Sequence, residues 1–220
     1  MKRTIAASLF FALLAPLALW AQGSGADNAD NYVEGQHYIR IDTPVKTQNP
    51  DKVEVVEVFW YGCHHCYTFE PMVEAWQKQL PEYVDFHQSP AIWSGPMRLH
   101  AQAFYTAKAL DVLDKVHSPL FNALNVEGKR LLSKDEIGQV FVDQGIAKAD
   151  FDKAWSAFGV SAQVNQADAR ARSYKISGTP EMIVNGKFRV TARSAGSQAG
   201  MLDVVDYLIT REQAQLANAR

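Results

Sequence analysis

The stretch VEVVEVFWYGCHHC, residues 53–66, decides the fold, because it joins a strand to a helix and carries two cysteines at the junction. Its first eight residues, 53–60, are dense in β-branched and aromatic side chains, which is typical of a central strand covered on both faces. Tyr61 and Gly62 then turn the chain, and over residues 63–79 apolar side chains recur at helical spacing. We therefore expect a buried strand followed at once by a helix.

Cys63 and Cys66 are the only cysteines in the chain. At the first turn of a helix, the sulfur of Cys63 is expected near unpaired backbone N–H groups and the positive end of the helix dipole, which stabilise a thiolate. Three roles compete: a structural disulfide, a metal site that includes His64 and His65, and a redox pair. A disulfide that closes so small a loop restrains the unfolded chain little. Adjacent residues of a helical turn point in different directions, which disfavours a shared metal ion, so the redox pair is favoured.

The rest of the chain alternates between strand and helix patterns. Residues 83–88 are short enough for another strand and are bounded by Pro81 and Pro90, and from about 97 to 175 only helix signals recur. Further on, an Asn-Gly pair separates two short strands, 181–184 and 188–191, which predicts a hairpin. A helix over 201–209 is expected to close the fold. Three tryptophans are expected in the core: Trp76, Trp93 and Trp155.

The N-terminal segment, 1–26, reads as a targeting signal. Lys2 and Arg3 precede an apolar run, as in a secretory signal peptide. The alternative is a retained membrane anchor, but the run is shorter than the about 20 residues that span a bilayer. We expect cleavage after Ala26, which leaves 27–220 as one mature domain, and an oxidising compartment for the two cysteines.

Composition limits the possible functions. Hydrophobic residues make up 47% and charged residues 21% of the 220, as in a globular domain, which excludes a disordered chain and a polytopic membrane protein. The 22 basic and 24 acidic residues give a net charge of -2, and no stretch is rich in Lys or Arg. Nucleic acid is therefore not an expected partner.

Thr179 and Pro180 come just before the strand predicted at 181–184. A proline at the start of a strand, after a turn, is a site for a cis peptide bond, although a trans proline that begins an edge strand has the same pattern. A strand, then C-x-x-C at a helix start, then a late Thr-Pro before a hairpin resembles the thioredoxin fold. With the helical block and the export signal, the chain resembles the DsbA family of periplasmic dithiol oxidases. The resemblance implies an α/β, thioredoxin-like fold with an inserted helical subdomain at about 97–175.

The resemblance also implies roles within the cysteine motif. Cys63 matches the exposed nucleophile, Cys66 its buried partner, and His65 the histidine of the family's C-P-H-C motif. A protonated imidazole beside a thiolate lowers the thiol pKa, through an attraction of up to about 4 kcal/mol at contact. His64 stands where the family commonly has proline. The alternative for His64 and His65 is that both are exposed polar residues that fill the turn.

Other site residues are implied outside the motif. Thr179 and Pro180 are expected to hold an extended substrate by backbone pairing, and Thr179 departs from the valine common in the family. Glu57, six residues before Cys63, matches an acidic residue beneath the active cysteines. In a buried central strand its pKa would be raised and it could pass a proton to Cys66. On an open face it would be an ordinary solvent-facing residue.

The expected reaction is thiol–disulfide exchange, in which the disulfide of Cys63 and Cys66 passes to exported polypeptides with free cysteines. The resemblance implies a quinone-linked membrane partner that reoxidises the protein, and a periplasmic location. We expect a monomer without a metal or organic cofactor. A disulfide reductase or isomerase would use the same dithiol. The alternatives that are not enzymes are a metal-binding carrier and a binding module in which the disulfide is incidental.

Overall fold

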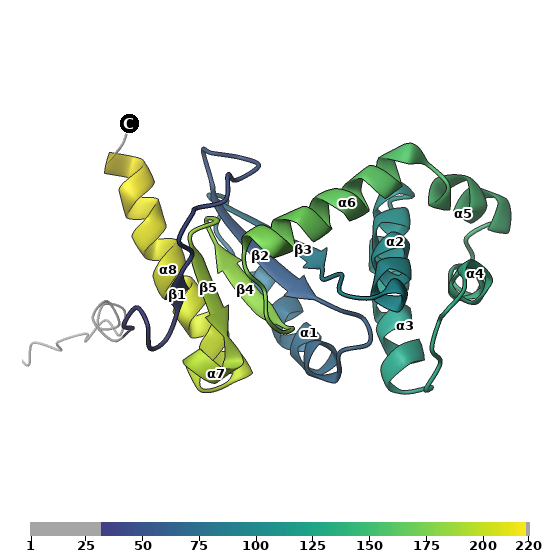
Figure 1. Ribbon diagram of the computed structural model, residues 1–220, viewed down its shortest axis with the longest axis horizontal. Coiled ribbons are helices and arrows are strands. Elements are labelled where there is room, and N and C mark those ends of the chain that lie inside the picture. The colour runs from purple at the N-terminus through teal and green to yellow at the C-terminus, as the bar shows by residue number, and fades with distance from the viewer. Residues whose placement is uncertain (1–31, 219–220) are drawn as a thin grey trace, which may run out of the picture.

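The structure, a computed structural model, describes residues 32–218 and has a mixed sheet beside a block of helices (Figure 1). The signal peptide expected at 1–26 lies outside the described residues. Within the described part of the chain, every helix is too short or too polar to cross a membrane.

Within residues 32–218, five strands pair in the order β1-β5-β4-β2-β3. Their bounds are β1 Ile39–Arg40, β2 Val53–Phe59, β3 Val84–Pro90, β4 Glu181–Val184 and β5 Phe188–Thr191. Strand β2 is parallel to β3 and antiparallel to β4, and all seven of its residues are buried. Its carboxyl end points toward the C-x-x-C motif, so the most protected strand of the sheet positions the cysteines.

The two faces of β2 pack against different layers, because successive side chains of a strand point in opposite directions. Val53 and Val55 belong to a core shared with α1, His64–Gln77, and α8, Gln198–Asn218. Val56 and Val58 pack on the other face, in a core with Tyr174 at the end of α6. The sheet is therefore covered on both sides, as the uninterrupted apolar run predicted.

The helical block lies between β3 and β4 in the chain (Figure 1). It consists of α2 Gly95–Ala109, α3 Leu113–Asn125, α4 Lys134–Asp143, α5 Lys148–Trp155 and α6 Phe158–Ser173. Its apolar core includes Phe104, Phe121 and Phe151 and reaches Phe59 at the end of β2. The short helix α7, Ala192–Ala195, links β5 to α8. The block therefore borders the carboxyl end of the central strand.

An ion pair ties the helical block to the far end of the sheet. Arg170 of α6 donates to the fully buried Glu54 of β2 at 2.5 Å, and the backbone N–H of Gln48 donates to the other oxygen of Glu54 at 2.8 Å. Both oxygens of this carboxylate are therefore satisfied, as a buried charge requires.

The predicted elements are present with small shifts of their ends, and the closing helix is longer than the 201–209 expected. Trp76 is buried and Trp155 is partly buried. The prediction for Trp93 is wrong: it lies in the loop between β3 and α2 and is 52% exposed, because that loop brings no second layer over it. The α/β, thioredoxin-like fold with an inserted helical block is confirmed.

Candidate active site

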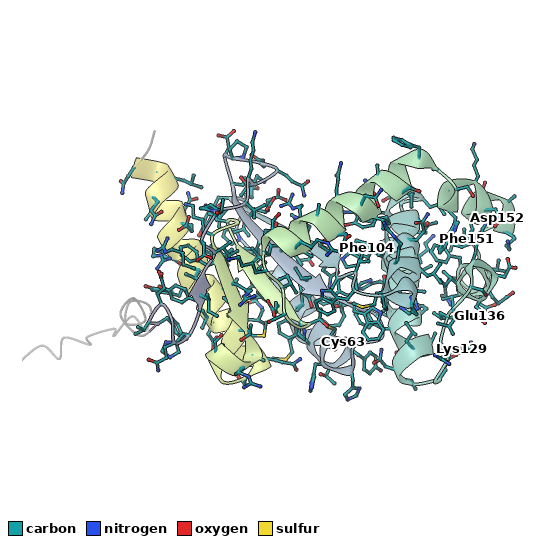
Figure 2. All side chains as sticks on the ribbon, in the orientation of Figure 1. Cys63, Phe104, Lys129, Glu136, Phe151 and Asp152 are labelled. Carbon is teal, nitrogen blue, oxygen red and sulfur yellow. The ribbon has the colours of Figure 1, made fainter. Side chains whose placement is uncertain are left out.

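Cys63 is the N-cap residue of α1, in extended backbone conformation, and its sulfur accepts the backbone N–H of Cys66 at 3.2 Å. Both cysteines are free thiols. Cys63 is 9% exposed and Cys66 is fully buried, in the order expected for a nucleophile and its partner. Figure 2 labels Cys63 at the start of α1, on the side of the helical block.

The loop before β4 contacts the same sulfur atom, that of Cys63. The Cys63 thiol donates to the carbonyl oxygen of Thr179 at 3.3 Å. The peptide bond between Thr179 and Pro180 is cis, as the Thr-Pro pattern indicated. The structure therefore brings Cys63, Cys66, Thr179 and Pro180 together from opposite ends of the chain.

These surroundings shift the pKa values of the two thiols in opposite directions. The pKa of Cys63 is lowered to about 6, first by the hydrogen bond from the Cys66 thiol, then by that of the Thr179 side chain and by the backbone N–H groups of Cys66 and His65, while burial opposes the shift. Burial, and next the Cys63 sulfur, raise the pKa of Cys66. At neutral pH the dithiol therefore carries a thiolate on Cys63 and a neutral thiol on Cys66.

Glu57 is fully buried on the face of β2 that α1 covers, so it is not a solvent-facing residue. Gln88 donates one amide N–H to Glu57 at 2.8 Å and the other to Glu70 of α1 at 2.9 Å. Burial, and next the charge of Glu70, raise the pKa of Glu57 to about 8. This carboxyl group therefore holds a proton at neutral pH. When it is ionised, its charge is one of the causes that raise the pKa of Cys66.

His64 and His65 are both exposed on the first turn of α1. The carbonyl oxygen of His65 accepts the side-chain amide of Gln198, at the start of α8, at 2.5 Å, and the Thr68 hydroxyl at 3.1 Å. His65 lowers the pKa of Cys63 through its backbone N–H. The structure thus places both histidines beside the redox pair with their rings in water.

The turn before Cys63 is anchored to the helical block. The indole N–H of Trp60 donates to Nδ1 of His100 at 2.9 Å, and Nε2 of His100 lies 3.2 Å from the carbonyl oxygen of Leu131. A Cβ atom on Gly62 would lie 2.4 Å from the Trp60 ring, so only glycine fits there without displacing the ring. These contacts hold the approach to the cysteines in one place.

Sequence reasoning missed three polar residues beneath α1. They are Glu70, Gln88 and His117. Gln88 donates to Glu70 at 2.9 Å, and Nε2 of His117, on α3, lies 3.2 Å from Oε1 of Glu70. Glu70 follows Cys66 by one helical turn, a spacing that puts both on one face and could have revealed it. Gln88 is opposite Glu57 in the strand register, which only the pairing of β2 with β3 shows. No local signal marks His117.

The described residues that come nearest to a metal-binding geometry do not include a cysteine. They are Glu54, Asp85 and His87, whose ligand atoms lie within 4.8 Å of one another. Both oxygens of Glu54 are already bonded, to Arg170 and to Gln48. A cation there would have to displace an arginine.

Known proteins with this sequence pattern and fold share a name. Residues 54–203 match the family described as DSBA-like thioredoxin domain. The chain is 42% identical over 206 residues to the thiol:disulfide interchange protein DsbA of Azotobacter vinelandii, covering 92% of this chain and 96% of that relative. The protein of the same name from Pseudomonas aeruginosa PAO1 is 38% identical over 202 residues, with coverage of 92% and 96%.

Solved structures agree with these relatives. The crystal structure of Pseudomonas aeruginosa DsbA superposes with a TM-score of 0.82 at 38% identity, over 85% of this chain and 97% of that one. The oxidoreductase DsbA from Xylella fastidiosa gives a TM-score of 0.78 at 29% identity, over 83% and 98%. The chain therefore belongs to the DsbA family and is a thiol:disulfide oxidoreductase that donates disulfides to cysteine-containing proteins.

Proposed function

We propose that Cys63 is the sulfur that substrates attack and that Cys66 is the leaving group. A substrate thiolate bonds to Cys63, the bond between Cys63 and Cys66 breaks, and its electron pair goes to Cys66. A second substrate thiolate then attacks the substrate sulfur of this mixed disulfide and releases Cys63 as a thiolate. Two electrons pass from two substrate thiols to the cysteine pair, so the substrate gains a disulfide and this protein becomes a dithiol.

The observation that supports this direction is the pKa of Cys63, about 6. A stable thiolate is a good leaving group, and its stability favours the reduced form of the protein. Each pKa unit below the working pH stabilises the dithiol by about 1.4 kcal/mol, which is about 30 mV of oxidising power for a two-electron couple. Disulfide donation is therefore favoured over reduction or isomerisation.

Glu57 supplies the proton in this proposal. When Cys66 leaves as a thiolate in a buried site, its own raised pKa makes it take up a proton. Glu57 carries one at neutral pH, since its pKa is about 8. Transfer of that proton gives a neutral Cys66 thiol and a Glu57 carboxylate, so no charge is left on the buried sulfur.

His65 and His64 tune the Cys63 thiolate by charge when their rings are protonated. Because both rings are exposed, water screens this attraction well below its contact value. His65→Ala should raise the pKa of Cys63 and make the couple less oxidising, by about 30 mV per unit. An unchanged pKa of Cys63 in this variant would remove the His65 ring from the mechanism.

Substrates are extended, cysteine-bearing polypeptides that pair with the backbone beside Thr179 and Pro180. This is supported by the position of the Thr179 carbonyl, which already meets the Cys63 thiol at 3.3 Å. A peptide bound along this loop would place its own sulfur in line with Cys63.

The protein works in the periplasm as a monomer, and the dithiol passes two electrons and two protons to a quinone-linked membrane partner. The basic pair and apolar run at 1–26 support export. A stoichiometric disulfide donor must be reoxidised after each turnover, which makes an external oxidant necessary.

Equilibration of the purified protein with glutathione redox buffers tests the direction of catalysis. We expect Cys63 and Cys66 to stay reduced at glutathione ratios that oxidise an ordinary dithiol. A couple more reducing than the compartment would contradict the proposal and favour the reductase. In Cys66→Ser, mixed disulfides with substrate should accumulate at Cys63, because the internal route of release is gone.

A further inference from the structure

Five polar side chains from separate parts of the fold follow one another beneath α1, and the proposed function uses only the first. We call them the buried polar chain: Glu57, Gln88, Glu70, His117 and Tyr61. Four of the five are buried, and Gln88 is partly buried. Adjacent members are joined by contacts of 2.8, 2.9, 3.2 and 2.7 Å.

Tyr61 contacts one of the two ring nitrogens of His117, and Glu70 lies near the other. Burial, and next the charge of Glu70, raise the pKa of Tyr61 well above its ordinary value, so its hydroxyl stays protonated. That hydroxyl lies 2.7 Å from Nδ1 of His117, and it donates to Nδ1 in the tautomer that has the ring N–H on Nε2. The negative oxygen Oε1 of Glu70, 3.2 Å from Nε2, favours that tautomer. This contact is not a hydrogen bond, so it acts through charge and dipole.

The two carboxyl groups that share Gln88 are not equivalent. Glu70 faces an N–H of Gln88 on one oxygen and the N–H of His117 on the other. Glu57 has the Gln88 N–H on Oε2, while its buried Oε1 has no hydrogen-bond partner among the described residues. Donors favour the ionised form of a carboxyl group, and two adjacent buried carboxyl groups resist double ionisation. The single negative charge therefore belongs on Glu70.

From this asymmetry we infer that His117 is a positioning residue for disulfide donation: it keeps Glu70 ionised, and the ionised Glu70 keeps the transferable proton on Glu57. The inference rests on the proposed role of Glu57 as proton donor to Cys66. The His117 ring exchanges no proton with substrate and touches no reacting sulfur; it fixes where one buried proton resides.

The groups that face Glu57 from the neighbouring elements are few. From α1 they are Glu70 and the two cysteines, Cys63 and Cys66. From β4 the residue in register is Met182, which brings no charge. The charge on Glu70 is therefore the one that His117 can influence without changing the thiols themselves.

Removal of the His117 ring nitrogen reverses the arrangement. Without the dipole of the His117 N–H beside Oε1, the negative charge of the buried Glu70 is disfavoured, so Glu70 takes up a proton and the repulsion that held the proton on Glu57 disappears. Glu57 then ionises at lower pH, and fewer molecules have a proton ready for Cys66. The alkaline limit of the disulfide-donation rate should move to lower pH.

The first experiment is single-turnover oxidation of a cysteine-containing peptide by the oxidised full chain, measured across pH. In His117→Phe, whose ring fits among the aromatic neighbours of α3, we expect the alkaline fall in rate to move down by roughly one pH unit. Tyr61→Phe removes only the hydroxyl and leaves the tautomer of His117 unfixed, so a smaller shift of the same sign is expected. If His117→Phe does not fold, the pH profile of Tyr61→Phe tests the inference in its place.

The second experiment locates the proton by infrared spectroscopy of the oxidised protein at neutral pH. In the parent, the carboxylic-acid band should disappear in Glu57→Gln. In the His117→Phe background, Glu57→Gln should leave a carboxylic-acid band, because the proton is then held by Glu70. A residue with only a structural role would not move a proton from one carboxyl group to another.

His87→Gln is the matched control, because His87 is a partly buried histidine on the face of β3 opposite to Gln88, and its Nε2 lies 3.3 Å from the side-chain amide of Gln48. Its pH profile should equal that of the parent. If Glu57→Gln itself leaves the profile unchanged, the proposed role of Glu57 fails and this inference fails with it. If Glu57→Gln changes the profile while the His117 and Tyr61 variants do not, only this inference is overturned.

Discussion

The Cys63 thiol lies 3.3 Å from the carbonyl oxygen of Thr179, a residue 116 positions later in the chain. The same sulfur accepts the backbone N–H of Cys66 at 3.2 Å. One contact is local to the helix start and the other depends on the complete fold. The reactivity of Cys63 is therefore set jointly by the first helical turn and by the loop before β4.

The lowered pKa of Cys63 and the raised pKa of Cys66 predict selective alkylation. At pH values near 7, iodoacetamide should label Cys63 of the reduced protein more than about tenfold faster than Cys66, because only the thiolate reacts. Peptide mass spectrometry of timed samples measures both rates. The denatured protein is the control, where the two cysteines should react alike. Equal labelling in the folded protein would refute the assignment of the nucleophile.

Thr179→Val should raise the pKa of Cys63, because the side-chain hydrogen bond of Thr179 is one of the contacts that lower it. The couple should become less oxidising at the same time, by about 30 mV for each pKa unit. A pH titration of thiolate ultraviolet absorbance measures the pKa, and glutathione equilibration measures the potential. Thr179→Ser keeps the hydroxyl and should behave as the parent. A Val variant with the parental pKa would show that the hydroxyl has no effect.

Glu57→Gln should make the oxidised protein relatively more stable as the pH rises. The folded-state pKa of Glu57 is raised from 4.5 to about 8, so its stabilising protonated form is complete below the unfolded pKa and is lost as pH rises toward the folded one. The parent should lose up to about 1.4 kcal/mol per pH unit in that interval relative to the variant. Urea unfolding at several pH values measures this difference. Parallel stability curves would contradict the buried, protonated state of Glu57.

Arg170→Leu should destabilise the protein by about 3 kcal/mol, because it leaves the fully buried Glu54 without its cation. Arg172 is the matched control two residues away: it is mostly exposed and pairs with Asp168, so Arg172→Leu should cost less than about 1 kcal/mol. Chemical denaturation compares the two variants. Similar losses of unfolding free energy in both variants would show that the buried ion pair between α6 and β2 stabilises the protein no more than the exposed pair does.

The strand, the active-site helix and the hairpin could be predicted because each has a local pattern. The apolar run at 53–60 contains the buried strand Val53–Phe59, and the Asn-Gly pair lies between β4 and β5. The cysteines and Glu57 were found for the same reason, since all three lie in or next to that first strand. Local sequence patterns were sufficient for the parts of the site whose residues are close together in the sequence.

The members of the buried polar chain could not be predicted in the same way. Gln88, Glu70 and His117 lie on β3, α1 and α3, and each looks like an ordinary polar residue of its own element. Only the packing of these elements on β2 brings their side chains together. The prediction for Trp93 is wrong for a different reason. Its aromatic character predicted burial, but the loop that carries it leaves it 52% exposed.

The contact between Cys63 and Thr179 also affects the biogenesis of the protein. Synthesis starts at the N-terminus, so Cys63 is made 116 residues before the loop that completes its surroundings. Until that loop docks, Cys63 also lacks the hydrogen bond of the Thr179 side chain, which is one of the contacts that lower its pKa, so a smaller fraction of the thiol is ionised. Full reactivity is acquired only when folding is complete.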